Sequence, residues 1–197
     1  MPYLRTMKFS IILIVVFIGL SACNKIVKKT DEITKVELAT GSCFGTCQFT
    51  ATSIDNEFHY KYFGGSFSFP LPGNKKPKDS YTGYYEGLIN RSLWDTLILK
   101  LNKIHYKQLD TLYAHSVDDQ SLEVIIYYQN KIKHIKAQSA SLPDSVLEAF
   151  NWIANSYKSI KLKPAKDTLH FETQTQNEFA LYKIPKNLRF MPPLKKR

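Results

Sequence analysis

The chain has 197 residues, of which 44% are hydrophobic and 13% aromatic, and it carries a net charge of +10 at pH 7. This composition excludes intrinsic disorder for the middle of the chain and supplies enough apolar side chains for one core domain. Six basic residues and no acidic one lie in residues 183–197, so the excess charge is concentrated at the C-terminal end. A nucleic-acid-binding domain would carry this charge on a folded face, and we therefore expect no nucleic-acid partner.

The first 22 residues have the pattern of a secretory signal peptide. Lys8 precedes an uncharged apolar run at 11–18, and Leu-Ser-Ala then precedes Cys23. The run is shorter than the roughly 20 apolar residues that span a bilayer, which favours a signal peptide over a transmembrane anchor. A cysteine directly after Leu-Ser-Ala resembles a bacterial lipoprotein signal. That resemblance implies removal of residues 1–22 and attachment of diacylglycerol and a fatty acyl chain, such as palmitate, to Cys23. The alternative is an ordinary cysteine near a signal peptide.

The middle of the chain, residues 33–163, is expected to form one α+β domain behind a short charged tether, residues 23–32. Alternating or β-branched apolar residues predict its strands. The predicted strands cover 33–39, 49–54, 58–63, 81–88, 122–128 and 131–136. Asp55-Asn56 and Gln129-Asn130 favour turns and close two hairpins, whereas Gly64-Gly65 is expected to interrupt the third strand.

Two helices are predicted, one after each group of strands. Asn90 is a favourable N-cap, and apolar residues follow it at helical spacing as far as Lys103. Pro143 fits the first turn of a second helix that reaches Tyr157. This order predicts an antiparallel sheet with two helices packed on one face, with a degenerate ββα repeat as an elaboration. Residues 164–197 are expected to form a polar, basic and partly disordered tail, with an edge strand over 168–173 as one option.

Cys43 and Cys47 flank a short loop between the first two predicted strands. In an oxidising compartment, two cysteines four residues apart can form a disulfide, and Gly45 between them allows the bend. Two reduced, buried thiols are a second interpretation. A third is a thiol-redox or copper site, because the spacing resembles that of Sco-type copper assembly factors, which place the pair before a helix. Copper titration of the reduced protein, compared with Cys43→Ser, would test this third interpretation.

No other group of residues indicates catalysis. The five histidines lack the spacing of a helical zinc site, and no P-loop, nucleophile elbow or dinucleotide fingerprint is present. We therefore expect no metal and no cofactor, and the sequence leaves an enzymatic role uncertain. Aromatic residues crowd the segment 58–85, where alternation places Phe58, Tyr60 and Tyr62 on one strand face. Most of these rings are expected in the core, and any exposed remainder would suit a glycan or protein partner.

These features resemble an uncharacterised lipoprotein family of Bacteroidota, a domain of unknown function. The resemblance rests on Cys23, on Gly41-Ser-Cys-Phe-Gly-Thr-Cys47, on Tyr85-Glu86-Gly87 before the first helix, and on the second hairpin and helix. It covers about residues 33 to 160, and Gln48 stands where the family usually carries proline. The family implies location and architecture but no activity: a lipid-anchored protein of the bacterial cell envelope, either periplasmic or surface-exposed. We therefore expect a non-enzymatic binding or interaction domain that contacts the membrane through its lipid and has an envelope protein or glycan as partner.

Overall fold

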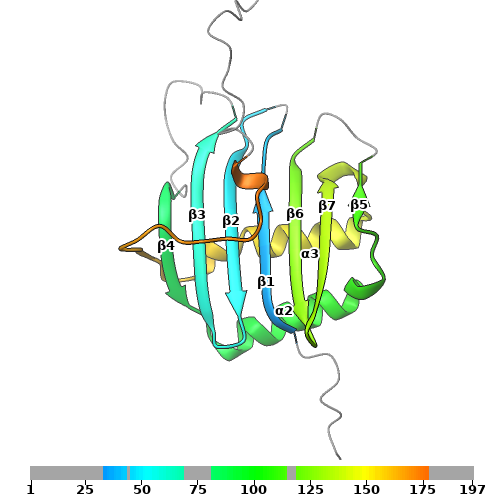
Figure 1. The fold of residues 1–197 in the computed structure, drawn as a ribbon, viewed down its shortest axis with the longest axis horizontal. Coiled ribbons are helices and arrows are strands. Elements are labelled where there is room, and N and C mark those ends of the chain that lie inside the picture. The colour runs from blue at the N-terminus through cyan, green and yellow to red at the C-terminus, as the bar shows by residue number, and fades with distance from the viewer. Residues whose placement is uncertain (1–32, 44, 69–80, 115–118, 178–197) are drawn as a thin grey trace, which may run out of the picture. The chain divides into compact units, whose positions relative to one another are not determined.

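An eight-stranded sheet lies at the centre of the domain in the computed structural model, which describes residues 33–43, 45–68, 81–114 and 119–177 (Figure 1). The strands lie in the order β5-β7-β6-β1-β2-β3-β4-β8, and all neighbours are antiparallel except β5 and β7. The strands are β1 (Ile33–Thr40), β2 (Gln48–Asp55), β3 (His59–Phe67), β4 (Gly83–Leu88), β5 (Leu112–Tyr113), β6 (Ser121–Tyr128), β7 (Lys131–Gln138) and β8 (Lys163–Pro164). All six predicted strands are therefore confirmed, and the two-residue strands β5 and β8 are additions.

Two α-helices cover one face of this sheet (Figure 1). Helix α2 (Arg91–Lys103) begins after Asn90, whose side chain accepts a hydrogen bond of 2.9 Å from the Leu93 N–H. Helix α3 (Asp144–Ala154) begins directly after Pro143. The predicted α+β class is confirmed. The ββα repeat stays a prediction, because four strands precede α2 and three lie between α2 and α3. Short 3-10 helices lie at Tyr106–Gln108, Ser139–Ser141, Ser156–Ser159 and Thr175–Asn177. In the described part of the chain, no helix has the length and hydropathy needed to cross a membrane.

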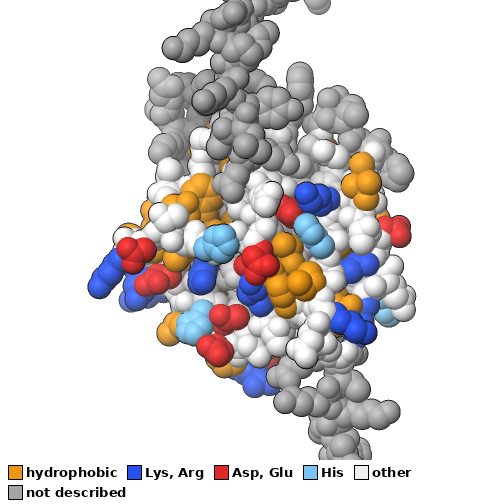
Figure 2. All heavy atoms as spheres, in the orientation of Figure 1, with side chains coloured by type: hydrophobic (Ala, Val, Ile, Leu, Met, Phe, Trp, Pro, Cys, Tyr) orange, Lys and Arg blue, Asp and Glu red, His pale blue; other side chains and the backbone are white. Residues whose placement is uncertain are grey.

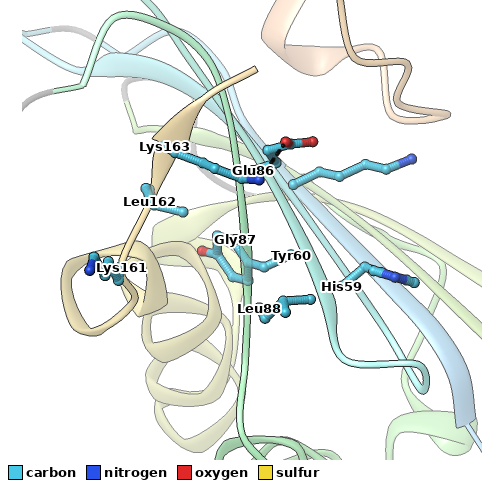
Figure 3. A pocket seen from close by; sticks show the side chains of 9 residues that line it. His59, Tyr60, Glu86, Gly87, Leu88, Lys161, Leu162 and Lys163 are labelled. Atoms are coloured by element: carbon cyan, nitrogen blue, oxygen red, sulfur yellow. Dashed lines mark ion pairs between the residues drawn. The ribbon is translucent and has the colours of Figure 1, made fainter. Parts of the chain in front are cut away.

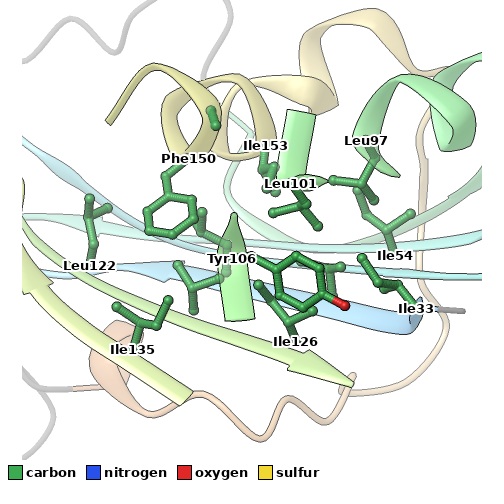
Figure 4. Close-up of a cluster of buried hydrophobic side chains, with 14 of the residues drawn as sticks. Ile33, Ile54, Leu97, Leu101, Tyr106, Leu122, Ile126, Ile135, Phe150 and Ile153 are labelled. Carbon is green, nitrogen blue, oxygen red and sulfur yellow. The ribbon is translucent and has the colours of Figure 1, made fainter. Parts of the chain in front are cut away.

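The main hydrophobic core lies between the sheet and the two helices (Figure 4). Val36 and Leu38 alternate with Glu37 along the central strand β1, so the two apolar side chains face the helices and the carboxylate faces away. Burying an aliphatic or aromatic side chain of this size contributes about 1.5–3 kcal/mol. Core side chains that are completely buried include Val36, Leu38, Ile54, Leu97, Leu101, Ile126, Ile135, Phe150 and Ile153.

The sheet face opposite the helices is called the outer face below, and residues 165–177 are called the C-terminal segment. After β8 pairs with β4, the C-terminal segment crosses the outer face toward β1, β2 and β6 (Figure 1). Phe171 is 9% exposed and packs against Ala39 and Ala51, whose small side chains leave room for the ring. The option of an edge strand over 168–173 is wrong: these residues form no strand, and β8 pairs with β4 in its place.

Strand β3 continues through the glycine pair at which an interruption was expected. It runs to Phe67, and the register with β2 shifts between the Gln48 and Thr50 pairs, which is the signature of a β-bulge. The side-chain amide of Gln48 donates to the carbonyl oxygens of Gly65 (3.2 Å) and Tyr81 (2.7 Å). The expected break is therefore wrong, because a bulge and these side-chain hydrogen bonds allow the strand to continue.

Candidate functional site

The predicted disulfide between Cys43 and Cys47 is confirmed, with a Cα–Cα distance of 5.9 Å. It closes the loop between β1 and β2, as expected for a structural bridge, and the interpretation as two reduced thiols is not supported. Ser68, just past β3, ties this loop to the sheet. Its hydroxyl accepts from the Cys47 N–H (3.1 Å) and donates to the Gly45 carbonyl oxygen, and its N–H donates to the Cys47 carbonyl oxygen (2.8 Å).

Cys23 and the basic residues 183–197 lie outside the described residues, so lipid attachment stays a prediction. Within the described ranges, no group of three or more His, Cys, Asp or Glu side chains is placed to hold a metal ion. The copper interpretation of Cys43 and Cys47 also stays a prediction, because it concerns the reduced pair.

The aromatic cluster of β3 and β4 belongs mostly to the core, as predicted. Tyr60 and Tyr62 are fully buried on the helix side, and the Tyr62 ring lies 4.6 Å from that of Tyr157, centroid to centroid. Burial raises the pKa of both Tyr60 and Tyr62 above the usual range, so the two hydroxyls stay protonated. The hydroxyl of Tyr60 lies 2.8 Å from that of Ser156. These rings therefore anchor the sheet to the chain that follows α3.

Two carboxylates on the outer face are buried almost completely. Glu37 of β1 is 2% exposed and Glu123 of β6 is 1% exposed, although ionised side chains are rarely buried without partners. Their partners are the main-chain N–H groups of the C-terminal segment. Oε2 of Glu37 accepts from Glu172 (2.7 Å) and Thr173 (3.3 Å). Glu37 thus accepts hydrogen bonds from the first two of four consecutive main-chain N–H groups, residues 172–175, and Glu123 accepts from the other two.

Glu123 makes the second half of this arrangement. Its Oε2 accepts from the N–H groups of Gln174 (2.7 Å) and Thr175 (2.8 Å), and its Oε1 lies 2.7 Å from Nε2 of His134 on β7. Burial alone would raise the pKa of Glu123, but these hydrogen bonds outweigh burial and lower the pKa. The carboxylate is therefore held in its charged form.

Lys35 completes the charge balance beside Glu37. Its Nζ lies 2.8 Å from Oε1 of Glu172 and 3.3 Å from Oε1 of Glu37, and it sits over the Tyr127 ring. Burial would lower the pKa of Lys35, but the two carboxylates raise it overall, and Lys35 in turn lowers the pKa of Glu172. Figure 2 shows charged, histidine and hydrophobic side chains mixed on this face. The contacts of Glu37, Glu123 and Lys35 thus fasten the C-terminal segment to the sheet.

A cavity of about 590 Å³ lies beside β4, next to the point where its pairing with the short strand β8 ends (Figure 3). This volume falls in the range of small-molecule sites, roughly 300–1,000 Å³. The lining residues are His59, Tyr60, Lys61, Glu86, Gly87, Leu88, Lys161, Leu162 and Lys163. We call this the β4–β8 cavity. Strands β3 and β4 supply one part of its wall, and the chain that leads into β8 supplies the rest.

Gly87 lies where β4 packs closely against the chain that leads into β8. A Cβ atom at Gly87 would lie 3.1 Å from the Lys161 carbonyl oxygen and 3.3 Å from Cδ2 of Leu162, so a side chain there would crowd the passing chain. Beside it, Leu88 is 71% exposed. Lys163 forms an ion pair with Glu86 at 3.2 Å. The β4–β8 cavity thus combines apolar surface with ammonium groups, a combination suited to binding.

His59 and His134 lie in the predicted strands 58–63 and 131–136, but the sequence pattern did not indicate their acidic partners. Nδ1 of His59 lies 3.2 Å from Oδ2 of Asp55, and His134 contacts Glu123 across neighbouring strands. The missed signal was a glutamate at an otherwise apolar strand position, as in Leu122-Glu123-Val124. The cavity had no such signal, because the residues that form its wall come from three separate stretches of chain, 59–61, 86–88 and 161–163.

Comparison with known proteins identifies the family of the chain. No curated protein matches the chain. A family model described as a domain of unknown function, DUF6438, matches residues 34–157, which include β1 from its second residue, β2 to β7 and both α-helices. The chain belongs to the DUF6438 family, a domain of unknown function.

Proposed function

We propose that the protein is a lipid-anchored protein of the bacterial cell envelope whose folded domain binds a ligand in the β4–β8 cavity without transforming it. The anchoring part rests on the order of Lys8, the apolar run at 11–18 and Cys23. The binding part rests on the β4–β8 cavity, a concave site with apolar and charged groups side by side. The family match adds no activity to this proposal.

The geometry supports binding better than catalysis. Three charged groups with shifted pKa values on the outer face are engaged with one another or with the main chain of the C-terminal segment: Glu123, Glu172 and Lys35. A candidate acid or base needs room for a reacting group within hydrogen-bond reach. These contacts instead stabilise the fold, and the β4–β8 cavity is the concave surface on which the binding proposal rests.

Lipid attachment at Cys23 predicts a measurable difference between the wild-type chain and Cys23→Ser. In bacteria grown with a clickable palmitate analogue, the wild-type protein should incorporate the label and partition into the detergent phase of Triton X-114. The variant should lose the label and move to the aqueous phase, because the anchor needs the cysteine thiol. Equal labelling of both proteins would contradict the proposed lipid attachment at Cys23.

Ligand binding in the β4–β8 cavity predicts localised changes in the NMR spectrum of the domain. Small compounds of anionic, neutral and cationic character should be screened against the labelled protein. At least one class should shift the amide signals of Gly87, Leu88 and Leu162, with the signals of Leu99 on α2 as an internal control, because Leu99 is 69% exposed but lies outside the cavity wall. Shifts of equal size at Leu99 and at the cavity residues, or no shift with any class of compound, would contradict the proposed ligand binding.

A further inference from the structure

The charges of the β4–β8 cavity do not cancel among its own side chains. Three lysines and one glutamate line it, and the glutamate, Glu86, is already paired with Lys163. Among the described residues, no carboxylate oxygen lies within 4.0 Å of the ammonium group of Lys61 or of Lys161. In the part of the chain that the structure describes, two positive charges at the cavity therefore have no ion-pair partner, which favours an anion and disfavours a cation.

The other acidic groups nearby are engaged with His59. Asp55 Oδ2 and Glu57 Oε2 lie 3.2 Å and 3.7 Å from its Nδ1, and Asp55 Oδ1 accepts from the His59 N–H at 2.9 Å. Neither Asp55 nor Glu57 is part of the cavity wall. The two carboxylates of the turn that precedes β3 therefore lie against the wall residue His59, and among the described residues neither forms an ion pair with Lys61 or Lys161.

Apolar surface lies beside these charges. Leu88 is 71% exposed, the largest exposure of any large hydrophobic residue in the described part of the chain, and Leu162 is half-buried on the other side of Gly87. Sugar sites usually present an aromatic face, but Tyr60, the aromatic member of the wall, has a fully buried side chain. The wall therefore suits an alkyl chain better than a glycan.

We propose that the β4–β8 cavity binds a small amphiphile with one anionic group and a short alkyl chain. The positive potential of Lys61 and Lys161 at the wall attracts the anionic group, and Leu88 and Leu162 cover the chain. Carboxylate and phosphate head groups share the chemistry required here. This inference rests on the proposed ligand-binding function and adds the class of ligand.

The test is a calorimetric titration of the mature chain, residues 23–197, carrying Cys23→Ser so that no lipid competes for the site. The probes are octanoate, octyl phosphate, octanol, octyltrimethylammonium and acetate, each below its micelle concentration. Octanoate or octyl phosphate should bind at least about tenfold more tightly than octanol, octyltrimethylammonium and acetate. The tighter of the two anions identifies the head group.

Matched variants locate the binding. The double substitution Lys61→Ala/Lys161→Ala should weaken octanoate binding by about tenfold, whereas Lys131→Ala, an exposed lysine of β7, should change it by less than about twofold. Leu88→Ser should weaken binding, and Leu99→Ser, of nearly equal exposure, should not.

Octanol binding as tightly as octanoate, or equal losses in Leu88→Ser and Leu99→Ser, would overturn the inference. If neutral or cationic compounds shift the signals of Gly87 and Leu88 and the anions do not, the inference is wrong and the proposed binding function stands. If no class of compound reaches the cavity, both are wrong.

Discussion

At the scale of single residues, the environment of Glu37 and Glu123 depends on chain that lies far away in the sequence. Both side chains are almost inaccessible, and their hydrogen-bond donors come from residues 172–175. A buried carboxylate without donors is costly, and four main-chain N–H groups offset that cost. The two glutamates therefore make the C-terminal segment a requirement of the fold.

Replacing Glu123 by glutamine should lower the free energy of unfolding by about 1–3 kcal/mol, because a neutral amide oxygen accepts weaker hydrogen bonds and loses the charge next to His134. Urea unfolding followed by circular dichroism measures this change. Glu148→Gln is the control, because that side chain is 77% exposed, and it should cost less than about 0.5 kcal/mol. Equal losses in the two variants would show that the buried contacts of Glu123 contribute nothing.

The pH dependence of stability provides a second measurement of the same contacts. The pKa of Glu123 is lowered by folding, so the stability that its charge contributes is complete above the unfolded value of 4.5 and is lost as the pH falls through the lowered folded value. Glu172, whose pKa is also lowered, acts in the same direction. Between about pH 5 and pH 3, the wild-type protein should therefore lose more stability than Glu123→Gln.

At the scale of elements, β3 shows how a strand accommodates the close approach of another part of the chain. A Cβ atom at Gly64 would lie 1.9 Å from the carbonyl oxygen of Tyr81, which accepts the hydrogen bond from Gln48. Only a residue without a side chain fits this position. The glycine pair thus marks a packing constraint inside a continuous strand.

Substituting Gly64 by alanine should lower the free energy of unfolding by at least about 2 kcal/mol, because the backbone at Tyr81 must move to relieve the overlap. Gly45→Ala is the matched control, since its Cβ atom would lie at an ordinary 3.6 Å from Cys43 Sγ. Denaturant midpoints at unchanged slope measure both changes. Midpoints that fall equally would contradict the assignment of this constraint to Gly64.

At the scale of the whole molecule, local sequence patterns predicted the helices and strands but not the β4–β8 cavity or the contacts of Glu123. Strand alternation, the Asn90 cap and the position of Pro143 act over a few residues, and the structure confirms what they indicate. The β4–β8 cavity and the contacts of Glu123 combine residues more than 50 positions apart, and a single sequence carries no record of such distances. The C-terminal segment was hardest to predict, because it lacks the periodicity of a helix or strand.

The attachment of the C-terminal segment also sets where the chain can be cut or fused. A fragment that ends with the family match at residue 157 would lack β8 and all four N–H donors to Glu37 and Glu123. Its β4 would offer an unpaired edge, the kind of surface through which sheets aggregate. Expression fragments should therefore extend to residue 177 at least, and an affinity tag or fluorescent reporter belongs after that position.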